Sequence, residues 1–189
     1  TTNTQLKNAR CSQKIALSFL NSKPPNYPRA IRFLSLAHYQ GSTVATYHLG
    51  VLYKTAPALF RNYHLAFTFL KIAAQAGHQK AYRLLGDLYA QGQGVARDVD
   101  SAISWYVKAA DKAGHPVQLK LASLYKEKHD FGLAMQCLHR VKEVANQGLV
   151  CRLKGDIYED QRKQDLAMCE YRKGYSYGDV LSTYYLGKY

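Results

Sequence analysis

The feature that most constrains this chain is a helical pattern that returns at a fixed interval. Residues 81–114 hold two amphipathic helical patterns, each with apolar residues at helical spacing on one face. Gly92 and Gly94 separate the two patterns, and Gly114 follows the second as a helix stop. Because a single helical hairpin cannot bury both of its apolar faces, this unit needs neighbours of the same kind.

Shifting the sequence by 36 residues reveals those neighbours. Leu85 and Gly86 return as Leu49 and Gly50, and a small residue beside a large one lets two helices approach closely. An alanine marks the second helix of every pair, at Ala30, Ala66, Ala102, Ala134 and Ala167. We therefore predict an all-α chain of about 11 helices. It consists of antiparallel pairs at approximately 1–41, 42–77, 78–114, 115–147 and 148–178, and a terminal helix at 179–189. That last helix is either a cap over the array or the start of a further pair.

The central unit also carries a specific residue pattern. The pattern consists of an alanine, Leu-Gly-x-x-Tyr, a Gly-x-Gly-Val loop, an aspartate, Ala-x-x-Trp-Tyr-x-Lys-Ala-Ala and a closing glycine. In this chain the residues of the pattern are, in order, Ala81, Leu85, Gly86, Tyr89, Gly92, Gly94, Val95, Asp98, Ala102, Trp105, Tyr106, Lys108, Ala109, Ala110 and Gly114. This pattern resembles the Sel1-like repeat, a subfamily of the tetratricopeptide-like helical hairpins. The resemblance implies a single repeat domain over residues 1–189 that folds as a right-handed α-solenoid.

The connection inside a pair shortens in the second half of the chain. Successive first helices carry a tyrosine at Tyr53, Tyr89, Tyr125 and Tyr158. From this tyrosine to the alanine of the second helix the distance is thirteen residues in the two earlier pairs and nine in the two later ones. The shorter spacing resembles that of plain tetratricopeptide repeats. We therefore expect Sel1-like hairpins first and tetratricopeptide-like hairpins after them.

The charge of the chain is strongly basic and unevenly distributed. The net charge is +13, and residues 1–95 contain eleven Lys and Arg against one acidic residue, Asp87. Residues 96–189 contain fifteen Lys and Arg against twelve Asp and Glu. Such a field attracts anionic partners, although solubility and a basic species background explain the same charge without any partner.

The cysteines and the apolar segments bear on the compartment. Cys11, Cys137, Cys151 and Cys169 form no C-x-x-C pair, so we expect free, half-buried thiols. The alternative is a disulfide between Cys137 and Cys151, which would indicate an oxidising compartment. No apolar run has transmembrane length. Since the sequence starts at Thr1 rather than Met, we expect a processed chain or a fragment of a longer one, in the cytoplasm or the periplasm.

The sequence contains no recognisable catalytic or cofactor motif. It lacks H-E-x-x-H, a Walker loop and G-x-S-x-G. His78 and His115 follow helix-stop glycines, where a histidine can interact with the terminal carbonyls of the preceding helix. Gly92 and Gly94 follow a helix rather than a strand, so they belong to the repeat turn and not to a phosphate loop. We expect no enzymatic activity, no metal and no cofactor.

Resemblance to tetratricopeptide packing places candidate partner-binding residues on the concave face, which the first helix of each pair lines. These candidates are Tyr47, Val51, Lys54, Lys80, Arg83, Asp87, Ser123, Lys126, Arg152, Asp156 and Tyr184. Arg83 with Asp87, and Arg152 with Asp156, are i,i+4 pairs whose charges partly neutralise each other. The set is interpreted either as a solvated helix face or as a groove of Tyr, Arg and Lys, where Tyr and Arg are residue types enriched at binding hot spots.

The resemblance implies a non-catalytic scaffold or adaptor, of a kind found in bacteria, that binds a protein or peptide in its groove. The basic charge favours an acidic partner. The alternative is that the basic N-terminal half binds nucleic acid, an anionic membrane or a polysaccharide. Paired polar side chains that read bases do not recur from repeat to repeat, which makes nucleic acid the less favoured partner.

Overall fold

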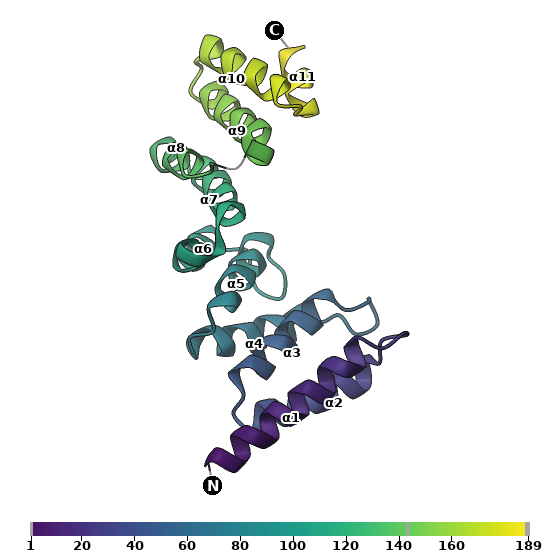
Figure 1. Cartoon of the computed structure of the whole chain (residues 1–189). Coiled ribbons are helices and arrows are strands. Elements are labelled where there is room, and N and C mark those ends of the chain that lie inside the picture. Colours follow the sequence, from purple (N-terminus) through teal and green to yellow (C-terminus); the bar gives the residue numbers. More distant parts are fainter. Residues whose placement is uncertain (1, 143, 188–189) are drawn as a thin grey trace. The chain divides into compact units, whose positions relative to one another are not determined.

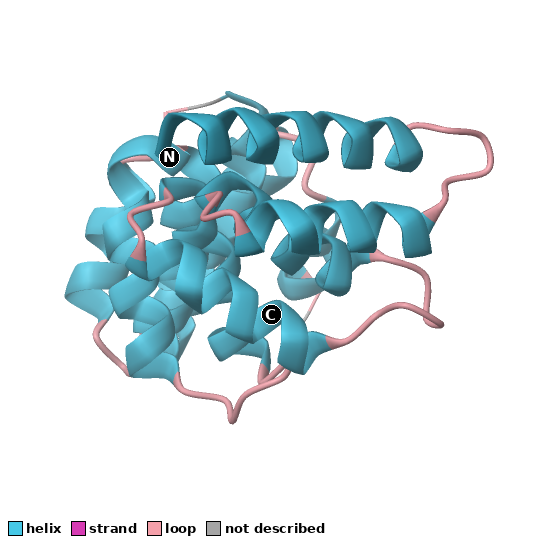
Figure 2. Ribbon diagram, turned by 90° about the horizontal axis from the view of Figure 1, so that it is seen from below, coloured by secondary structure: helices cyan, strands magenta, loops and turns pink. Residues whose placement is uncertain are grey.

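The computed structural model of the chain describes residues 2–142 and 144–187. Eleven α-helices and the short 3-10 helix Val144–Asn146 make up the regular structure of this described part, and it contains no strand (Figure 2). The predicted all-α class is therefore confirmed.

The chain divides into two compact units, residues 1–109 and 110–189. The helices of unit 1 are α1 (Thr2–Leu20), α2 (Tyr27–Tyr39), α3 (Thr43–Thr55), α4 (Tyr63–Gln75), α5 (Gln79–Gln91) and α6 (Val99–Ala113), which extends beyond Ala109. Those of unit 2 are α7 (His115–Glu127), α8 (Phe131–His139), α9 (Gln147–Asp160), α10 (Gln164–Ser176) and α11 (Val180–Leu186). Within the units, paired helices lie side by side: α1 with α2, α3 with α4, α7 with α8, and α9 with α10 (Figure 1).

Short polar side chains begin several of these helices. The Asn26 side-chain carbonyl accepts a hydrogen bond from the backbone N–H of Arg29 at 3.1 Å, and the Ser42 hydroxyl accepts one from Ala45 at 3.2 Å. Helices α4, α8 and α11 are capped in the same way by Asn62, Asp130 and Asp179. These caps satisfy N–H groups that a helix leaves unpaired in its first turn, which fixes where each helix starts.

Two glycines shape the loop after α5, where the sequence predicts a turn. Gly92 ends the helix in the left-handed region with φ +65°, and its N–H bonds to the Leu88 carbonyl. Gly94 has φ +74°, and any side chain on it would collide with the backbone carbonyl of Tyr63. The loop therefore rests on the start of α4, and it can do so only with glycine at that position.

Alanines and glycines let the helices of a pair approach closely. The five alanines that mark the second helices are all fully buried. A Cβ atom on Gly86 would lie 2.8 Å from Cδ1 of Tyr106, and one on Gly50 would lie 2.6 Å from Cγ of Leu70. The predicted alternation of small and large residues is therefore the packing that the core uses.

All four cysteines are free thiols, so the alternative of a disulfide between Cys137 and Cys151 does not apply. Cys137 and Cys151 are buried, whereas Cys11 and Cys169 are exposed. The expectation of half-buried thiols is wrong in this respect. Burial raises the pKa of the Cys137 and Cys151 thiols, so both stay protonated and pack as small apolar side chains.

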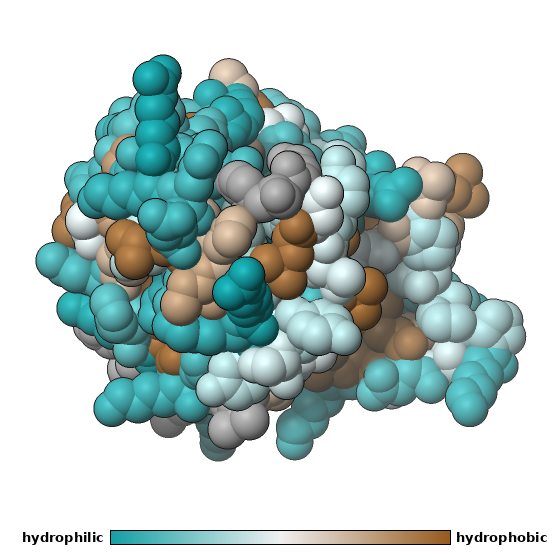
Figure 3. Space-filling view, turned by 90° about the horizontal axis from the view of Figure 1, so that it is seen from above, coloured by the Kyte–Doolittle hydropathy of each residue, from teal (hydrophilic) through white to brown (hydrophobic). Residues whose placement is uncertain are grey.

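The surface is mixed in character. On the face drawn in Figure 3, hydrophilic residues cover most of the area and apolar residues appear as separate spots. Within the described residues, no helix combines the length and the apolar character needed to cross a bilayer.

Candidate functional site

The predicted partner-binding residues of unit 1 lie on two first helices. Tyr47, Val51 and Lys54 lie on α3, and Lys80, Arg83 and Asp87 lie on α5. Spacings of three and four residues place each set on one side of its helix. Lys80 and Arg83 are exposed, whereas Asp87 is only 5% exposed. The six candidates thus include two exposed cations and one buried acid.

Asp87 is held by a tyrosine and a lysine from two other helices. The Tyr106 hydroxyl of α6 donates a hydrogen bond to Oδ1 of Asp87 at 2.6 Å, and Nζ of Lys54 lies 3.5 Å from Oδ2. Burial and the hydrogen bond to the Asp87 carboxylate raise the pKa of Tyr106, so this hydroxyl keeps its proton. We call Lys54, Asp87 and Tyr106 the unit 1 triad.

Asp87 meets a lysine from the preceding repeat. The sequence pairs Asp87 with Arg83, one turn away, but Lys54 is 33 positions earlier in the chain. Arg83 is exposed, and its charge lies close enough to Tyr106 to oppose the rise in the pKa of that hydroxyl. Arg83 therefore adds a cation at the surface beside a carboxylate that two other groups already hold.

Unit 2 repeats this arrangement at matched positions. The Tyr171 hydroxyl of α10 donates to Oδ1 of Asp156 on α9 at 2.9 Å, and Nζ of Lys126 on α7 lies 4.0 Å from Oδ2 of Asp156. We call Lys126, Asp156 and Tyr171 the unit 2 triad. In this triad the Tyr171 hydroxyl also lies 2.9 Å from Glu159, and Lys126 lies 3.5 Å from Asp160.

Burial is the main influence on the acid of the unit 2 triad. It raises the pKa of Asp156, although the bond from Tyr171 and the charges of Lys126 and Arg152 oppose the rise. Arg152 is thus close to Asp156, in keeping with the predicted i,i+4 pair. Its Nε atom lies 3.3 Å from Oδ2 of Asp179, so Arg152 also joins α9 to the start of α11.

The two remaining candidates are exposed. The Ser123 hydroxyl donates to the Leu119 carbonyl one turn earlier, at 3.1 Å. Tyr184 is 67% exposed and meets the ring of Tyr185 edge-on, with the centroids 5.5 Å apart. Of the unit 2 candidates, Lys126, Asp156 and Arg152 are therefore engaged in the triad or in the contact between α9 and α11. Ser123 and Tyr184 lie at the surface.

The triads recur in every second pair. The pairs that supply the lysine carry Val51 or Ser123 at the position of the aspartate, and the buried leucines Leu70 or Leu138 at the position of the tyrosine. From the sequence, Tyr106 is known only as part of the repeat pattern, and Tyr171 is not singled out. The alternation along the aligned repeats is the signal that would have revealed their polar role.

Tyr47 lies against a histidine for which we predicted a helix-end role. The backbone N–H of His78 bonds to the Ala73 carbonyl at 2.9 Å. Its imidazole, however, stacks on the Tyr47 ring, with centroids 4.3 Å apart and planes 20° apart. The His78 imidazole therefore forms a contact between α3 and the start of α5 that the sequence did not predict.

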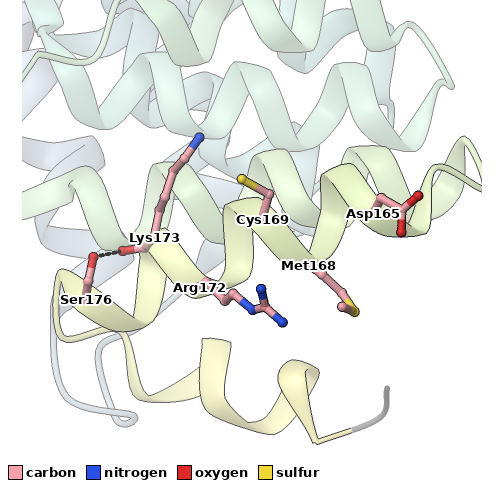
Figure 4. Close-up of a pocket in the computed structure, with 6 residues that line it drawn as sticks. All are labelled: Asp165, Met168, Cys169, Arg172, Lys173 and Ser176. Carbon is pink, nitrogen blue, oxygen red and sulfur yellow. Dashed lines mark hydrogen bonds between the residues drawn. The ribbon is translucent and has the colours of Figure 1, made fainter.

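An open depression of about 510 Å³ lies along one face of α10 in unit 2 (Figure 4). Its lining residues are Asp165, Met168, Cys169, Arg172, Lys173 and Ser176. Nζ of Lys173 lies 2.6 Å from Oε1 of Glu170, and the Ser176 hydroxyl donates to the Lys173 carbonyl at 2.7 Å. Both groups are thus engaged within their own helix. Across the described part of the chain, no three His, Cys, Asp or Glu side chains gather as a metal site.

Family comparisons agree on the type of repeat. The family described as tetratricopeptide repeat-like domain matches residues 66–184, and the Sel1 repeat matches residues 14–42 and 43–78. Residues 81–114, which carry the full Sel1-like pattern, fall inside the tetratricopeptide-like match. No match was found among the curated proteins.

Two solved bacterial structures share the fold. One is a protective antigen present in uropathogenic Escherichia coli strains, which displays an SLR fold; it matches 96% of the chain with a TM-score of 0.73 and 23% identity. The other is a Sel1 repeat protein from Oxalobacter formigenes, which matches 96% with a TM-score of 0.64 and 20% identity. The chain spans 41% of the first and 78% of the second. The chain therefore belongs to the tetratricopeptide repeat-like family and carries Sel1 repeat matches at residues 14–42 and 43–78, and this kind of repeat fold typically serves as a non-catalytic scaffold for protein–protein interaction.

Proposed function

We propose that this protein is a non-catalytic scaffold that binds an acidic segment of a protein partner through half-buried residues of α3 and exposed residues of α5 in unit 1. The proposed contacts are Tyr47 and Val51 on α3, and Lys80 and Arg83 on α5. Tyrosine and arginine are the residue types that dominate binding energy at protein interfaces, and a row of cations steers acidic partners to the surface.

The observation that supports this proposal is the burial of Asp87. It is the single acidic residue among residues 1–95, and the unit 1 triad holds it in the interior. The exposed side chains of that stretch therefore carry positive charge with no carboxylate among them. An incoming acidic segment can supply the missing negative charge without displacing an internal partner.

Charge reversal at the proposed contacts tests the proposal. The probe is a hexaglutamate peptide labelled with tetramethylrhodamine, and binding to the full chain is followed by fluorescence anisotropy. We expect Arg83→Glu with Lys80→Glu to weaken binding at least about tenfold, or about 1.4 kcal/mol. The matched control is Lys71→Glu with Arg61→Glu, which reverses two exposed charges on and just before α4.

Equal loss of affinity in the test and control variants would show that binding depends only on the net charge of the chain, and would contradict a site on α3 and α5. A competing single-stranded RNA that displaces the peptide, with an affinity that falls steeply with salt, would favour the nucleic-acid alternative instead.

A further inference from the structure

A cluster of basic and aromatic side chains joins the start of α5 to α3. The Tyr47 ring stacks on His78, and it also meets the His48 ring edge-on with the centroids 5.4 Å apart. Lys80 follows His78 by two residues, in the first turn of α5. One tyrosine thus contacts two imidazoles, and an ammonium group lies close to both.

The charges that act on this cluster are all positive. The charges of His78 and Lys80 lower the pKa of His48, and the charge of Lys80 lowers the pKa of His78. On its other side His48 lines a small cleft of about 120 Å³ with Tyr27 of α2 and Val51 of its own helix. No acidic residue occurs before Asp87, whose carboxylate faces Lys54 and Tyr106 instead.

We propose that Tyr47, His48, His78 and Lys80 bind a carboxylate group of the acidic partner, and that they bind it more tightly when the two imidazoles are protonated. This inference rests on the proposed function and specifies one contact within it. The ligand is a glutamate or aspartate side chain that lies among three groups able to carry positive charge. The Tyr47 ring stacks on His78 and favours the protonated form of that imidazole.

The direction of the pH dependence follows from the free protein. Burial, together with the neighbouring cations, lowers the pKa of His48 and of His78, so both rings are largely neutral at about pH 7.5. A bound carboxylate favours the charged rings and raises both pKa values. Binding therefore takes up protons, and affinity increases as the pH falls through the pKa values of the complex. Glutamate side chains stay ionised down to about pH 5.5 because their own pKa is about 4.3.

The test measures the Kd of the rhodamine-labelled hexaglutamate peptide for the full chain at about pH 7.5 and about pH 5.5, at constant ionic strength. One unit of pKa increase in one imidazole is equivalent to about a tenfold change in affinity, and we expect the Kd to fall at least about fivefold at the lower pH. In the variant His48→Gln/His78→Gln the ratio of the two Kd values should approach one. The matched control is His64→Gln/His139→Gln, which removes two exposed imidazoles elsewhere and should keep the full ratio.

Histidine NMR gives an independent readout. The C–H signals of His48 and His78 should titrate below the ordinary value of 6.5 in the free protein and move to higher pH when the peptide is present. A Kd that does not change with pH, or a pH dependence that survives in the double histidine variant, overturns this inference. If Arg83→Glu still weakens that pH-independent binding, the proposed function stands without it. Absence of peptide binding at both pH values overturns both.

Discussion

The two triads use the same residue types at matched repeat positions, in different electrostatic surroundings. In unit 1, Asp87 is the single acidic residue of the first 95, and Lys54 and Tyr106 are its partners. In unit 2, Tyr171 is shared between Asp156 and Glu159, and Lys126 between Asp156 and Asp160. The comparison separates a structural role from a functional one. The triad joins helices in both units, whereas the surplus of exposed cations distinguishes unit 1.

The largest expected effect comes from removing the acid of each triad. Asp87→Ala removes an acceptor from the buried Tyr106 hydroxyl and a counter-charge from the poorly solvated Lys54 ammonium, and should destabilise the chain by about 3 kcal/mol. Asp156→Ala should cost less, about 2 kcal/mol, because its lysine is farther away at 4.0 Å and burial already disfavours its charge. Urea unfolding followed by circular dichroism measures both. Equal losses would show that the two triads do not differ in strength. Losses below about 1 kcal/mol would show that the acid contributes little to the stability of the fold.

The next largest effect concerns the glycines that precede the two aspartates. Gly86→Ala and Gly155→Ala each place a methyl group against the ring of a triad tyrosine, and should destabilise by about 2 kcal/mol. Gly132→Ala is the matched control, since that helical glycine is exposed and its nearest neighbour is 3.8 Å away. The control should stabilise by about 0.5 kcal/mol through helix propensity. Destabilisation by the control as large as that of the other two would remove the steric explanation.

Removing only the hydroxyl groups sharpens the comparison further. Tyr106→Phe and Tyr171→Phe keep the ring in place and remove one hydrogen-bond donor, at a cost of about 1 kcal/mol each. Tyr39→Phe should leave the free energy of unfolding unchanged, because that side chain is 86% exposed. A triad variant as stable as the wild-type chain would indicate that the ring, and not the hydroxyl, is what the fold requires.

The smallest effect is a titration. Burial raises the pKa of Asp156 above 3.8, so the charged form is disfavoured in the folded state. The charged Asp156 carboxylate therefore lowers the free energy of unfolding at pH values above its pKa in the folded state. This destabilisation decreases as the pH falls through that pKa towards 3.8. Carboxyl carbon NMR should give a midpoint above 3.8, and Tyr171→Phe should raise it further, because the lost hydrogen bond favours the charged form. A midpoint that falls in this variant would contradict the assignment.

Sequence period alone predicted the helices and much of the core, because apolar spacing and small-residue positions are local properties. Ala66 and Ala102 lie in the core where the repeat places them, and Gly86 leaves the space that its large neighbour needs. The partners of Asp87 were not predictable in the same way. Lys54 and Tyr106 meet it through the stacking of separate helices, whereas the proximity rule for charged pairs on a helix reaches only one turn.

The basic and aromatic cluster was also missed for a physical reason. His78 follows a glycine at a helix end, and that local context favours a capping role. Its contact with Tyr47 depends on how α3 is placed beside the start of α5, which no short sequence window contains.

Since each triad takes its lysine from one pair and its aspartate and tyrosine from the next, neighbouring hairpins are not interchangeable. Deleting the pair that carries Lys54, or the pair that carries Lys126, would remove the triad lysine of Asp87 or of Asp156. Deleting or inserting a lysine pair together with the aspartate pair that follows it would keep each of these carboxylates matched with its lysine. We therefore expect changes in the length of this array to be tolerated best in steps of four helices, a lysine pair with the aspartate pair that follows it.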